Sequence, residues 1–235
     1  MKKRIFVVGI VFLAIFLLLY GTYKLMNSRT YQLFGGLTNH VETSQKVVAL
    51  TFDDGPTKNV DQLLPLLDKY NAKATFFVIG NELEKNLEEG KKIAQAGHQI
   101  GNHSYSHKRM VFKTPSFIQQ EIEKTNTLIR KTGYKEPIDF RPPNGKKLVG
   151  LPYYLNKHHM GTITWNLEPD TYYTSVSDKV DYVEKNVKPG SIILMHPMYD
   201  DTGKELKAIE GILATLSKEG YKFVTVNQLQ KWKNN

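Results

Sequence analysis

The chain has 235 residues, with 32 Lys and Arg against 23 Asp and Glu, and a formal net charge of +9. With 40% hydrophobic and 23% charged residues, it has the composition of a globular protein, which excludes wholesale disorder. Cysteine is absent, so disulfide bonds, thiolate metal sites and cysteine nucleophiles are excluded as well. Any metal must therefore be held by His and carboxylate side chains, and any nucleophile must be Ser, Thr, Lys, a carboxylate or an activated water.

The N-terminal region predicts a membrane anchor. Residues 1–4 are a basic tail, and residues 5–23 form a run without charged side chains. As a helix, these 19 residues can cross a hydrocarbon core of about 30 Å. The run lacks an Ala-x-Ala cleavage signal, which favours an uncleaved anchor; a cleaved, secreted form is the alternative. Three positive charges precede the run and one directly follows it, which places residues 1–4 in the cytoplasm and the rest of the chain outside the cell.

The exterior part of the chain divides into a stalk and one domain. Residues 24–45 are polar and rich in turn formers, which is typical of a stalk, and residues 46–235 have the length of a single domain. Without the three charges of residues 1–23, the exterior part carries a net charge of +6, which suits a polyanionic surface such as a cell wall. Its Lys residues stand beside Glu, as in residues 82–85, and this pattern indicates solvated helix faces and argues against a nucleic-acid partner.

From residue 47 onward, apolar runs alternate with segments of helical periodicity. Strands are predicted at residues 47–52, 74–79, 98–103, 138–141, 161–165, 191–195 and 222–226. Helices are predicted at residues 60–70, 81–96, 116–131, 151–157, 178–186 and 204–219. Pro65 is expected to kink the first helix or to delay its start. This alternation predicts an α/β domain of about seven parallel strands, either open or rolled into a barrel.

Four of the predicted strands end in clusters of reactive side chains. The clusters are Asp53-Asp54, His103 with His107, Arg141-Pro142-Pro143, and His196. Because the carboxyl ends of parallel strands meet at one edge of a sheet, this fold brings the four clusters together. Adjacent carboxylates repel one another unless a cation or a proton intervenes, and two imidazoles four residues apart can bind one ion. One Asp and the two His residues therefore predict an open, catalytic type of metal site.

Each cluster also has a purely structural interpretation. Residues 54–56, Asp-Gly-Pro, are typical of a turn, and Arg141 could be a surface residue. His103 and His107 could be stray residues among the seven histidines of the chain, and His196 could be a buried core histidine. In the functional interpretation, one carboxylate binds the metal, the other is a base, and His196 is a general acid. The occurrence of all four clusters at strand ends favours the functional interpretation.

Four motifs resemble those of the polysaccharide deacetylases, the NodB homology group or carbohydrate esterase family 4. They are Thr51-Phe52-Asp53-Asp54-Gly55-Pro56, His103-Ser104-x-x-His107, Arg141-x-Pro143 and Leu194-x-His196, in a resemblance that covers residues 46–231. The resemblance implies that Asp54, His103 and His107 bind a divalent metal, commonly Zn²⁺, with Co²⁺, Ni²⁺ or Mn²⁺ as alternatives. It also implies that Asp53 is the base, Arg141 orients Asp53, and His196 is the acid.

The same resemblance implies further roles and a fold. The backbone N–H of Asn144 would bind the oxyanion, and Leu194 would line the acetyl pocket. Trp165 and Tyr172 would contact the substrate. The implied fold is a deformed (β/α) barrel, and the implied substrate is a polymer of N-acetylated amino sugars.

One motif departs from the family pattern. The family's fourth segment often reads Trp-x-x-Asp-x-x-Asp-Trp, whereas residues 165–172 read Trp-Asn-Leu-Glu-Pro-Asp-Thr-Tyr. Counted from Trp165, Glu168 takes the first Asp place, and Asp170 lies one residue before the second. Either carboxylate could therefore support His196. Asp170 is preferred because its shorter side chain follows the rigid Pro169.

The resulting hypothesis is the hydrolysis of acetamide groups on a cell-wall polysaccharide, namely GlcNAc or MurNAc of peptidoglycan. The enzyme would be a monomer anchored in the membrane of a Gram-positive cell, with its catalytic domain outside. A carbohydrate-binding relative with weakened catalysis is the first alternative, and the altered fourth motif supports it. A metal-dependent phosphodiesterase ranks lower, because near the site the sequence supplies Arg141 and scattered Lys residues rather than a phosphate-binding cluster.

Overall fold

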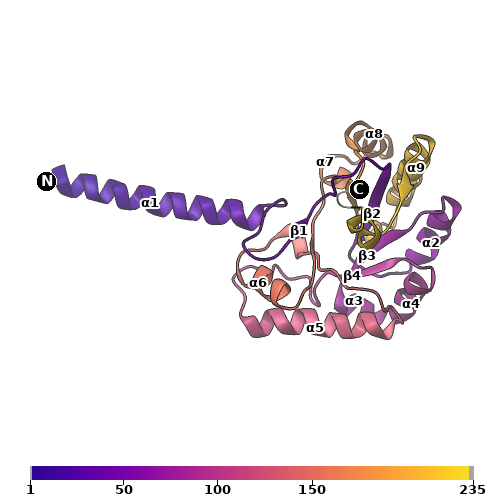
Figure 1. Cartoon of the computed structure of the whole chain (residues 1–235), viewed down its shortest axis with the longest axis horizontal. Helices are drawn as coiled ribbons and strands as arrows, with labels where there is room; N and C mark the ends of the chain where they lie inside the picture. Colours follow the sequence, from indigo (N-terminus) through magenta and orange to yellow (C-terminus); the bar gives the residue numbers. More distant parts are fainter. Residues whose placement is uncertain (1, 233–235) are drawn as a thin grey trace.

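The computed structural model describes residues 2–232 of the chain. Helix α1 (Lys2–Asn27) projects away from the other elements, which form one α/β body (Figure 1). The large apolar side chains of α1 from Ile5 to Tyr23 are exposed, and residues 3–27 are long and apolar enough to cross a membrane. A signal sequence near the N-terminus can meet the same criteria of length and composition, so the helix is compatible with an anchor and with a cleaved signal. Of the predicted tail and domain, Met1 and residues 233–235 lie outside the described residues.

The body alternates strands and helices along the chain. Its strands are β1 (Leu37–Thr38), β2 (Val47–Asp53), β3 (Ala74–Val78), β4 (Gln99–Asn102), β5 (Thr162–Ile163), β6 (Ile192–Met195) and β7 (Lys222–Phe223). Its α-helices are α2 (Val60–Lys69), α3 (Gly80–Lys85), α4 (Leu87–Gln95), α5 (Pro115–Lys131), α6 (Gly150–Lys157), α7 (Pro169–Tyr172), α8 (Val176–Asn186), α9 (Lys204–Lys218) and α10 (Val226–Gln230). Short 3₁₀ helices lie at Pro143–Gly145 and Pro197–Tyr199. The predicted α/β class is confirmed.

Parallel strands in the order β4-β3-β2-β6 form the central sheet, and β7 pairs with the start of β2. All seven residues of β2 are buried, as expected for a strand that is covered on both faces. The register aligns the strand ends, because Asp53 lies opposite Phe77 and Phe52 lies opposite Met195. Asp53 and the residues that follow β4 and β6 therefore meet at one edge of the sheet.

A second sheet pairs β1 with β5 in parallel, and single bridges connect it to the central sheet. Phe140 bridges β4 and β5, and Leu167 bridges β6. Strand β1 lies within residues 24–45, the segment that the sequence predicts as a stalk. Gln32 and Val41 in this segment are buried, so part of it packs on the body.

Prolines explain why the strand predicted at residues 138–141 is short. The structure reduces this strand to the bridging residue Phe140. Pro137, Pro142 and Pro143 flank it, and proline has no N–H group for a longer ladder of hydrogen bonds.

One predicted helix is divided in two, and another keeps its predicted start. The single helix predicted at residues 81–96 is divided into α3 and α4 at Asn86, whose Nδ2 donates to the Glu82 carbonyl at 3.0 Å. This local side-chain bond competes with the helical backbone bonds. Pro65 does not delay the start of α2, which begins at Val60. Because Pro65 is exposed, the carbonyl that it leaves without a helical donor can bond to water.

The core lies between the central sheet and the surrounding helices (Figure 1). Helix α9 illustrates the pattern, since its apolar residues recur at helical spacing on one face. The buried residues of α9 are Ala208, Ile209, Ile212, Leu213 and Leu216. Helix α8 packs against α9, α3 against α5, and α2 against α4. This packing holds the strand ends in fixed relative positions.

Candidate active site

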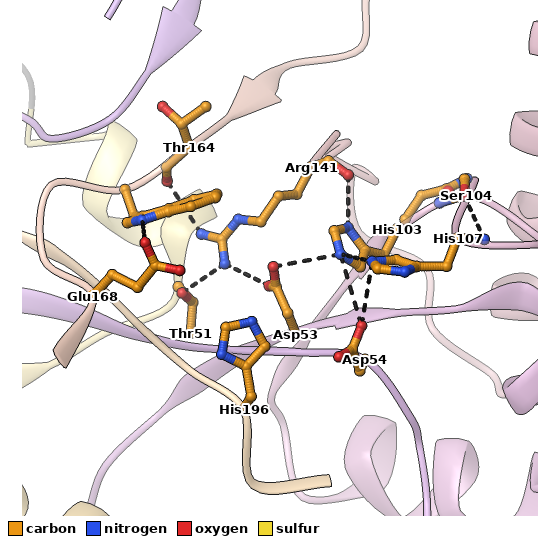
Figure 2. Close-up of polar contacts among 12 residues, drawn as sticks. Thr51, Asp53, Asp54, His103, Ser104, His107, Arg141, Thr164, Glu168 and His196 are labelled. Carbon is orange, nitrogen blue, oxygen red and sulfur yellow. Dashed lines mark hydrogen bonds and ion pairs between the residues drawn. The ribbon is translucent and has the colours of Figure 1, made fainter. Parts of the chain in front are cut away.

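Side chains that follow the strand ends line one cleft of about 270 Å³. The lining residues are Arg29, Asp53, Asp54, His103, His107, Asn144, Trp165, Glu168, Leu194 and His196. Figure 2 shows Asp53 between Arg141 and His103, with His196 and Asp54 close by. The four clusters, which are far apart in the sequence, are therefore brought to one place.

Asp54, His103 and His107 direct three donor atoms toward one another. The two Nε2 atoms lie 3.2 Å apart, and Asp54 Oδ1 lies 3.5 Å from His107 Nε2 and 3.9 Å from His103 Nε2. The donors of a tetrahedral zinc ion, with bonds of about 2.0–2.1 Å, stand about 3.3 Å apart. Asp54 Oδ1 is buried and has no hydrogen-bond partner within residues 2–232. An orphaned carboxylate oxygen that faces two imidazole nitrogens fits a divalent metal.

The loops after β2 and β4 position these donors. His103 Nδ1 donates to the Arg141 carbonyl at 2.7 Å, which leaves Nε2 unprotonated and free to bind a metal. The His107 N–H donates to Ser104 Oγ at 3.1 Å. Asp54, Ser104 and His107 have positive φ angles of 69°, 64° and 55°. Left-handed backbone is costly outside glycine and is concentrated at functional loops.

Asp53 is buried and paired with a guanidinium. Its Oδ1 accepts from Arg141 Nη1 at 2.6 Å, and its Oδ2 lies 3.5 Å from His103 Nε2. Burial alone would raise the pKa of Asp53, but Arg141 and the imidazoles of His103 and His196 lower it below the usual carboxyl value. Asp53 is therefore ionised at neutral pH, as a general base must be.

Arg141 is fully buried and is held by several groups at once. Its Nη1 also donates to Thr51 Oγ1 at 2.8 Å, and its Nη2 donates to the Thr164 carbonyl at 3.2 Å. The guanidinium lies 4.1 Å from the centre of the Phe77 ring. A guanidinium fixed in this way can orient Asp53, but it is too deeply buried to contact a ligand.

His196 follows β6, and Asp170 of α7 lies against it. Asp170 Oδ2 accepts the His196 backbone N–H at 2.9 Å and lies 3.2 Å from His196 Nδ1. Burial alone would lower the pKa of His196, but the bond to Asp170 and the nearby carboxylates of Asp53 and Asp54 raise it to about 9. His196 is therefore protonated at neutral pH and can act as a general acid.

A buried lysine, which the sequence does not indicate as a site residue, contacts Asp170 on the side away from His196 Nδ1, through Oδ1. Lys179 of α8 contacts Asp170 Oδ1 at 2.9 Å and also pairs with Glu205 of α9. Burial alone would raise the pKa of Asp170, but His196 and Lys179 lower it, so this carboxylate is ionised. Lys179 precedes the buried Val183 by four residues, and this helical spacing was the available signal for its inward position.

The alternative carboxylate, Glu168, contacts other groups. Its Oε2 accepts from Trp165 Nε1 at 2.9 Å and lies 2.9 Å from Arg29 Nη1. Asp170 is therefore the carboxylate in contact with His196. The sequence reasoning also missed Arg29, because nothing in the polar segment around it signals a contact with the domain.

The residues predicted to contact substrate do not all lie in the cleft. Trp165, Leu194 and Asn144 line the cleft, and Asn144 has a φ angle of 56°. Tyr172 is 62% exposed, packs on Tyr182 with ring centres 5.7 Å apart, and is not among the lining residues. The structure therefore brings three of these four residues to the cleft.

Comparison with known proteins gives consistent matches. The model of the family described as polysaccharide deacetylase matches residues 40–163. A peptidoglycan-N-acetylglucosamine deacetylase of Bacillus cereus is 34% identical over 206 residues, which cover 85% of this chain and 95% of that protein. A peptidoglycan-N-acetylmuramic acid deacetylase of Bacillus subtilis is 33% identical over 196 residues, which cover 82% of this chain and 40% of that protein.

A solved structure with a similar fold is described as a pseudoenzyme of carbohydrate esterase family 4 from Bacillus anthracis. It is 28% identical, has a TM-score of 0.76, and the match covers 86% of this chain and 72% of that one. The fold alone therefore does not separate a catalyst from a relative without activity.

Proposed function

This chain belongs to the polysaccharide deacetylase family, and from this premise we propose that it hydrolyses the N-acetyl groups of a cell-wall polysaccharide. The observation that carries the proposal is the meeting of three groups in one cleft. These groups are the donor set Asp54-His103-His107, the pair Asp53-Arg141 and the pair His196-Asp170. Together they supply a metal site, an ionised base and a protonated acid.

The protonation states of Asp53 and His196 support the following reaction. Asp54, His103 and His107 would hold a divalent metal, for which His and carboxylate donors favour Zn²⁺, and this metal would polarise the acetamide carbonyl and lower the pKa of bound water. Asp53 accepts a proton from the water whose oxygen bonds to the acetyl carbon. The C–N bond breaks, and His196 donates its proton to the leaving nitrogen. The products are acetate and a free amino sugar.

The remaining residues of the cleft bind the acyl group and the sugar. The backbone N–H of Asn144 donates to the oxyanion. Leu194 lines the acetyl pocket, and Trp165 lies at the wall of the cleft. Tyr172, on the surface beside Tyr182, could reach a longer glycan outside the cleft but not the reacting acetamide.

Peptidoglycan is the substrate that the properties of the chain support. The relatives act on its GlcNAc or MurNAc units. An uncleaved α1 would hold the domain against the outer face of the membrane, and the basic exterior part suits an anionic cell wall. We propose that residues 1–4 are the tail, residues 5–23 the anchor and residues 46–235 the domain of a monomer, and that residues 24–45 are a stalk, part of which packs on the domain through β1. We also propose that the bridges at Phe140 and Leu167 close the sheets into a deformed barrel.

Acetate release tests the proposed function. Full-length protein in detergent should release acetate from purified peptidoglycan, and a chelator should abolish the release until Zn²⁺ is restored. Mass spectrometry of the digested products should show a loss of acetyl from GlcNAc or from MurNAc, which identifies the sugar. If the metal-loaded protein releases no acetate from peptidoglycan, the proposal is wrong.

The rate of deacetylation is expected to fall at alkaline pH. His196 donates a proton, so kcat should fall as the pH rises through the pKa of His196, which is about 9 without a bound cation. A cation on Asp54 shifts this fall to lower pH, because it offsets the carboxylates that raise the pKa. Asp53 has a lowered pKa, so its protonation should reduce the rate only on the acid side. The measurement is kcat as a function of pH, and the expected profile is bell-shaped.

Two variants test which carboxylate supports the acid. Asp170→Asn removes the hydrogen-bonded charge that raises the pKa of His196, so the alkaline limb should move to lower pH. Glu168→Gln is the matched control, because the contacts of Glu168 are with Trp165 and Arg29, and the limb should stay in place. A shift in Glu168→Gln together with an unmoved limb in Asp170→Asn would assign the support to Glu168.

The anchor is expected to be retained. Full-length protein should sediment with membranes, and mass spectrometry should recover peptides from residues 1–24. The physical reason is the uncharged run of residues 5–23 without a cleavage signal. Recovery of mainly soluble protein that begins near residue 28 would show cleavage instead.

Carbohydrate binding without turnover is the second candidate function. Two observations favour it: the altered fourth motif and the similarity to a solved pseudoenzyme. Glycan binding by the metal-loaded protein without release of acetate would select this function.

A further inference from the structure

The segment that connects α1 to β1 docks on the rim of the cleft. We call residues 26–36, which are the last two residues of α1 and the stretch that follows it, the connecting segment. The Lys147 N–H donates to the Met26 carbonyl at 3.2 Å, and the Lys147 ammonium donates to the Ser28 carbonyl. Lys146 Nζ donates to Asn27 Oδ1 at 2.5 Å. Lys146 directly follows the 3₁₀ helix that carries Asn144, so these bonds fix the connecting segment beside the cleft.

Arg29 of the connecting segment is held in place by three contacts. Its backbone carbonyl accepts from Thr164 Oγ1 at 2.6 Å. Its guanidinium lies 4.3 Å from the centre of the Trp165 ring, and its Nη1 lies 2.9 Å from Glu168 Oε2. Thr164 is also the residue whose carbonyl accepts from Arg141. The position of Arg29 is thus fixed relative to the catalytic residues, which lowers the entropic cost of binding a ligand.

The guanidinium of Arg29 remains accessible from the cleft. The side chain of Arg29 is 40% exposed, whereas that of Glu168 is 11% exposed and Trp165 is 4% exposed. Within residues 2–232, Glu168 is the acceptor that contacts this guanidinium, through Nη1. The N–H groups on Nε and Nη2 are therefore left for a ligand. Because a guanidinium only donates, that ligand must present oxygen acceptors.

We propose that Arg29 is a substrate-binding residue, which donates to an oxygen of the glycan that carries the reacting acetamide. This inference rests on the proposed function. The oxygen belongs either to a hydroxyl or acetamide group or to the lactyl carboxylate of a muramyl unit. Arg29 precedes the part of the chain that the family model matches, which begins at residue 40. The connecting segment therefore adds a specificity determinant to the matched domain.

Steady-state kinetics of full-length protein in detergent micelles tests this role. The two substrates are tetra-N-acetylchitotetraose (chitotetraose below), which is neutral, and a peptide-free glycan strand of alternating GlcNAc and MurNAc, which carries lactyl carboxylates. Arg29→Ala should raise KM at least about tenfold, the usual effect of losing a hydrogen bond to a charged group, and leave kcat within about twofold. Arg29→Lys should give an intermediate KM, since the ammonium keeps the positive charge but lacks the planar fork of donors with which a guanidinium bridges Glu168 and the sugar. Lys24→Ala is the matched control, because Lys24 is an exposed cation on α1 that contacts the Tyr20 ring, and KM should not change.

The pattern across the two substrates identifies the oxygen. A higher KM for both supports a hydroxyl or acetamide acceptor, and a higher KM for the muramyl strand alone supports the carboxylate. An unchanged KM for both substrates overturns the inference, and so does a fall in kcat at constant KM, which would make Arg29 a positioning residue for Trp165 and Glu168. Thermal unfolding of each variant shows whether it is folded. If Arg29→Ala does not fold, the KM of Arg29→Lys for the two substrates tests the inference instead.

A binding measurement separates this inference from the proposed function. If the unmodified protein turns over neither substrate, the proposed function fails. Calorimetry then measures how chitotetraose and the muramyl strand bind to the Asp53→Asn protein, with and without Arg29. This comparison does not depend on turnover. In that background, Arg29→Ala should weaken the Kd for at least one glycan about tenfold. Equal Kd values with and without Arg29 would overturn the inference.

Discussion

Replacing Asp53 with Asn is expected to lower kcat by about 10²–10⁴-fold, the usual contribution of a positioned base. An amide cannot accept a proton from the attacking water, whereas the ionised carboxylate of Asp53 can. The donor set Asp54-His103-His107 is unchanged in this variant, so the bound metal should match that of the unmodified protein. The measurements are kcat for acetate release and the metal content of the purified protein.

A control is needed because Asp53 also stabilises the fold. Asp53→Asn leaves the buried guanidinium of Arg141 without its carboxylate, and breaking a buried ion pair typically costs about 3–5 kcal/mol. The free energy of unfolding must therefore be measured together with kcat. Thr51→Val is the matched variant, since it removes another acceptor of Arg141 but no proton acceptor, and it should lower kcat by at most about tenfold. A loss of less than tenfold in Asp53→Asn would contradict the role of base.

Replacing His103 with Ala is expected to remove both the bound metal and the activity. His103 is 2% exposed, and its Nδ1 is fixed by the Arg141 carbonyl, so no other side chain can take the place of Nε2. Loss of the metal should lower kcat by about 10³-fold or more, because the ion contributes several kcal/mol of transition-state stabilisation. Metal content by elemental analysis and the rate of acetate release are measured on the same preparation.

His98→Ala is the matched control for the loss of a buried imidazole. His98 is 4% exposed, accepts the Ala74 N–H at 3.1 Å and packs on Phe76, away from the cleft. This variant should be less stable than the unmodified protein but should keep its metal and most of its kcat. Unchanged metal content in His103→Ala would rule out the proposed donor set.

The positions of the candidate catalytic clusters could be predicted because they depend on local features of the chain. The apolar run of β2 predicts a buried strand, and Asp53-Asp54 follows it directly. The same holds for His196 after β6. Parallel pairing then brings these strand ends together, whatever the detailed shape of the sheet. Strand positions and candidate residues are therefore readable from the sequence.

Local chemistry that competes with periodicity was harder to predict. The break at Asn86 depends on a side chain that bonds to the Glu82 carbonyl, and helical periodicity continues across it. At residues 138–141 apolar and charged residues alternate as in a strand, but the flanking prolines lack the N–H donors that a longer strand needs. In both cases the interrupting residues, Asn86 and the prolines, are visible in the sequence. The prediction followed the spacing of the apolar residues instead.

The amino-acid sequence alone determined the α/β class, the strand-end clusters and the family, since each depends on residue type and on spacing along one segment. Tertiary packing decided which carboxylate contacts His196, because α7 and the buried Lys179 together turn Asp170 toward the imidazole. It also placed Arg29 in the cleft, through contacts with Trp165 and Glu168 that lie far away in the sequence. Such contacts do not change the spacing of apolar residues within either segment. They arise from close packing between segments and not from the conformational preferences of one segment.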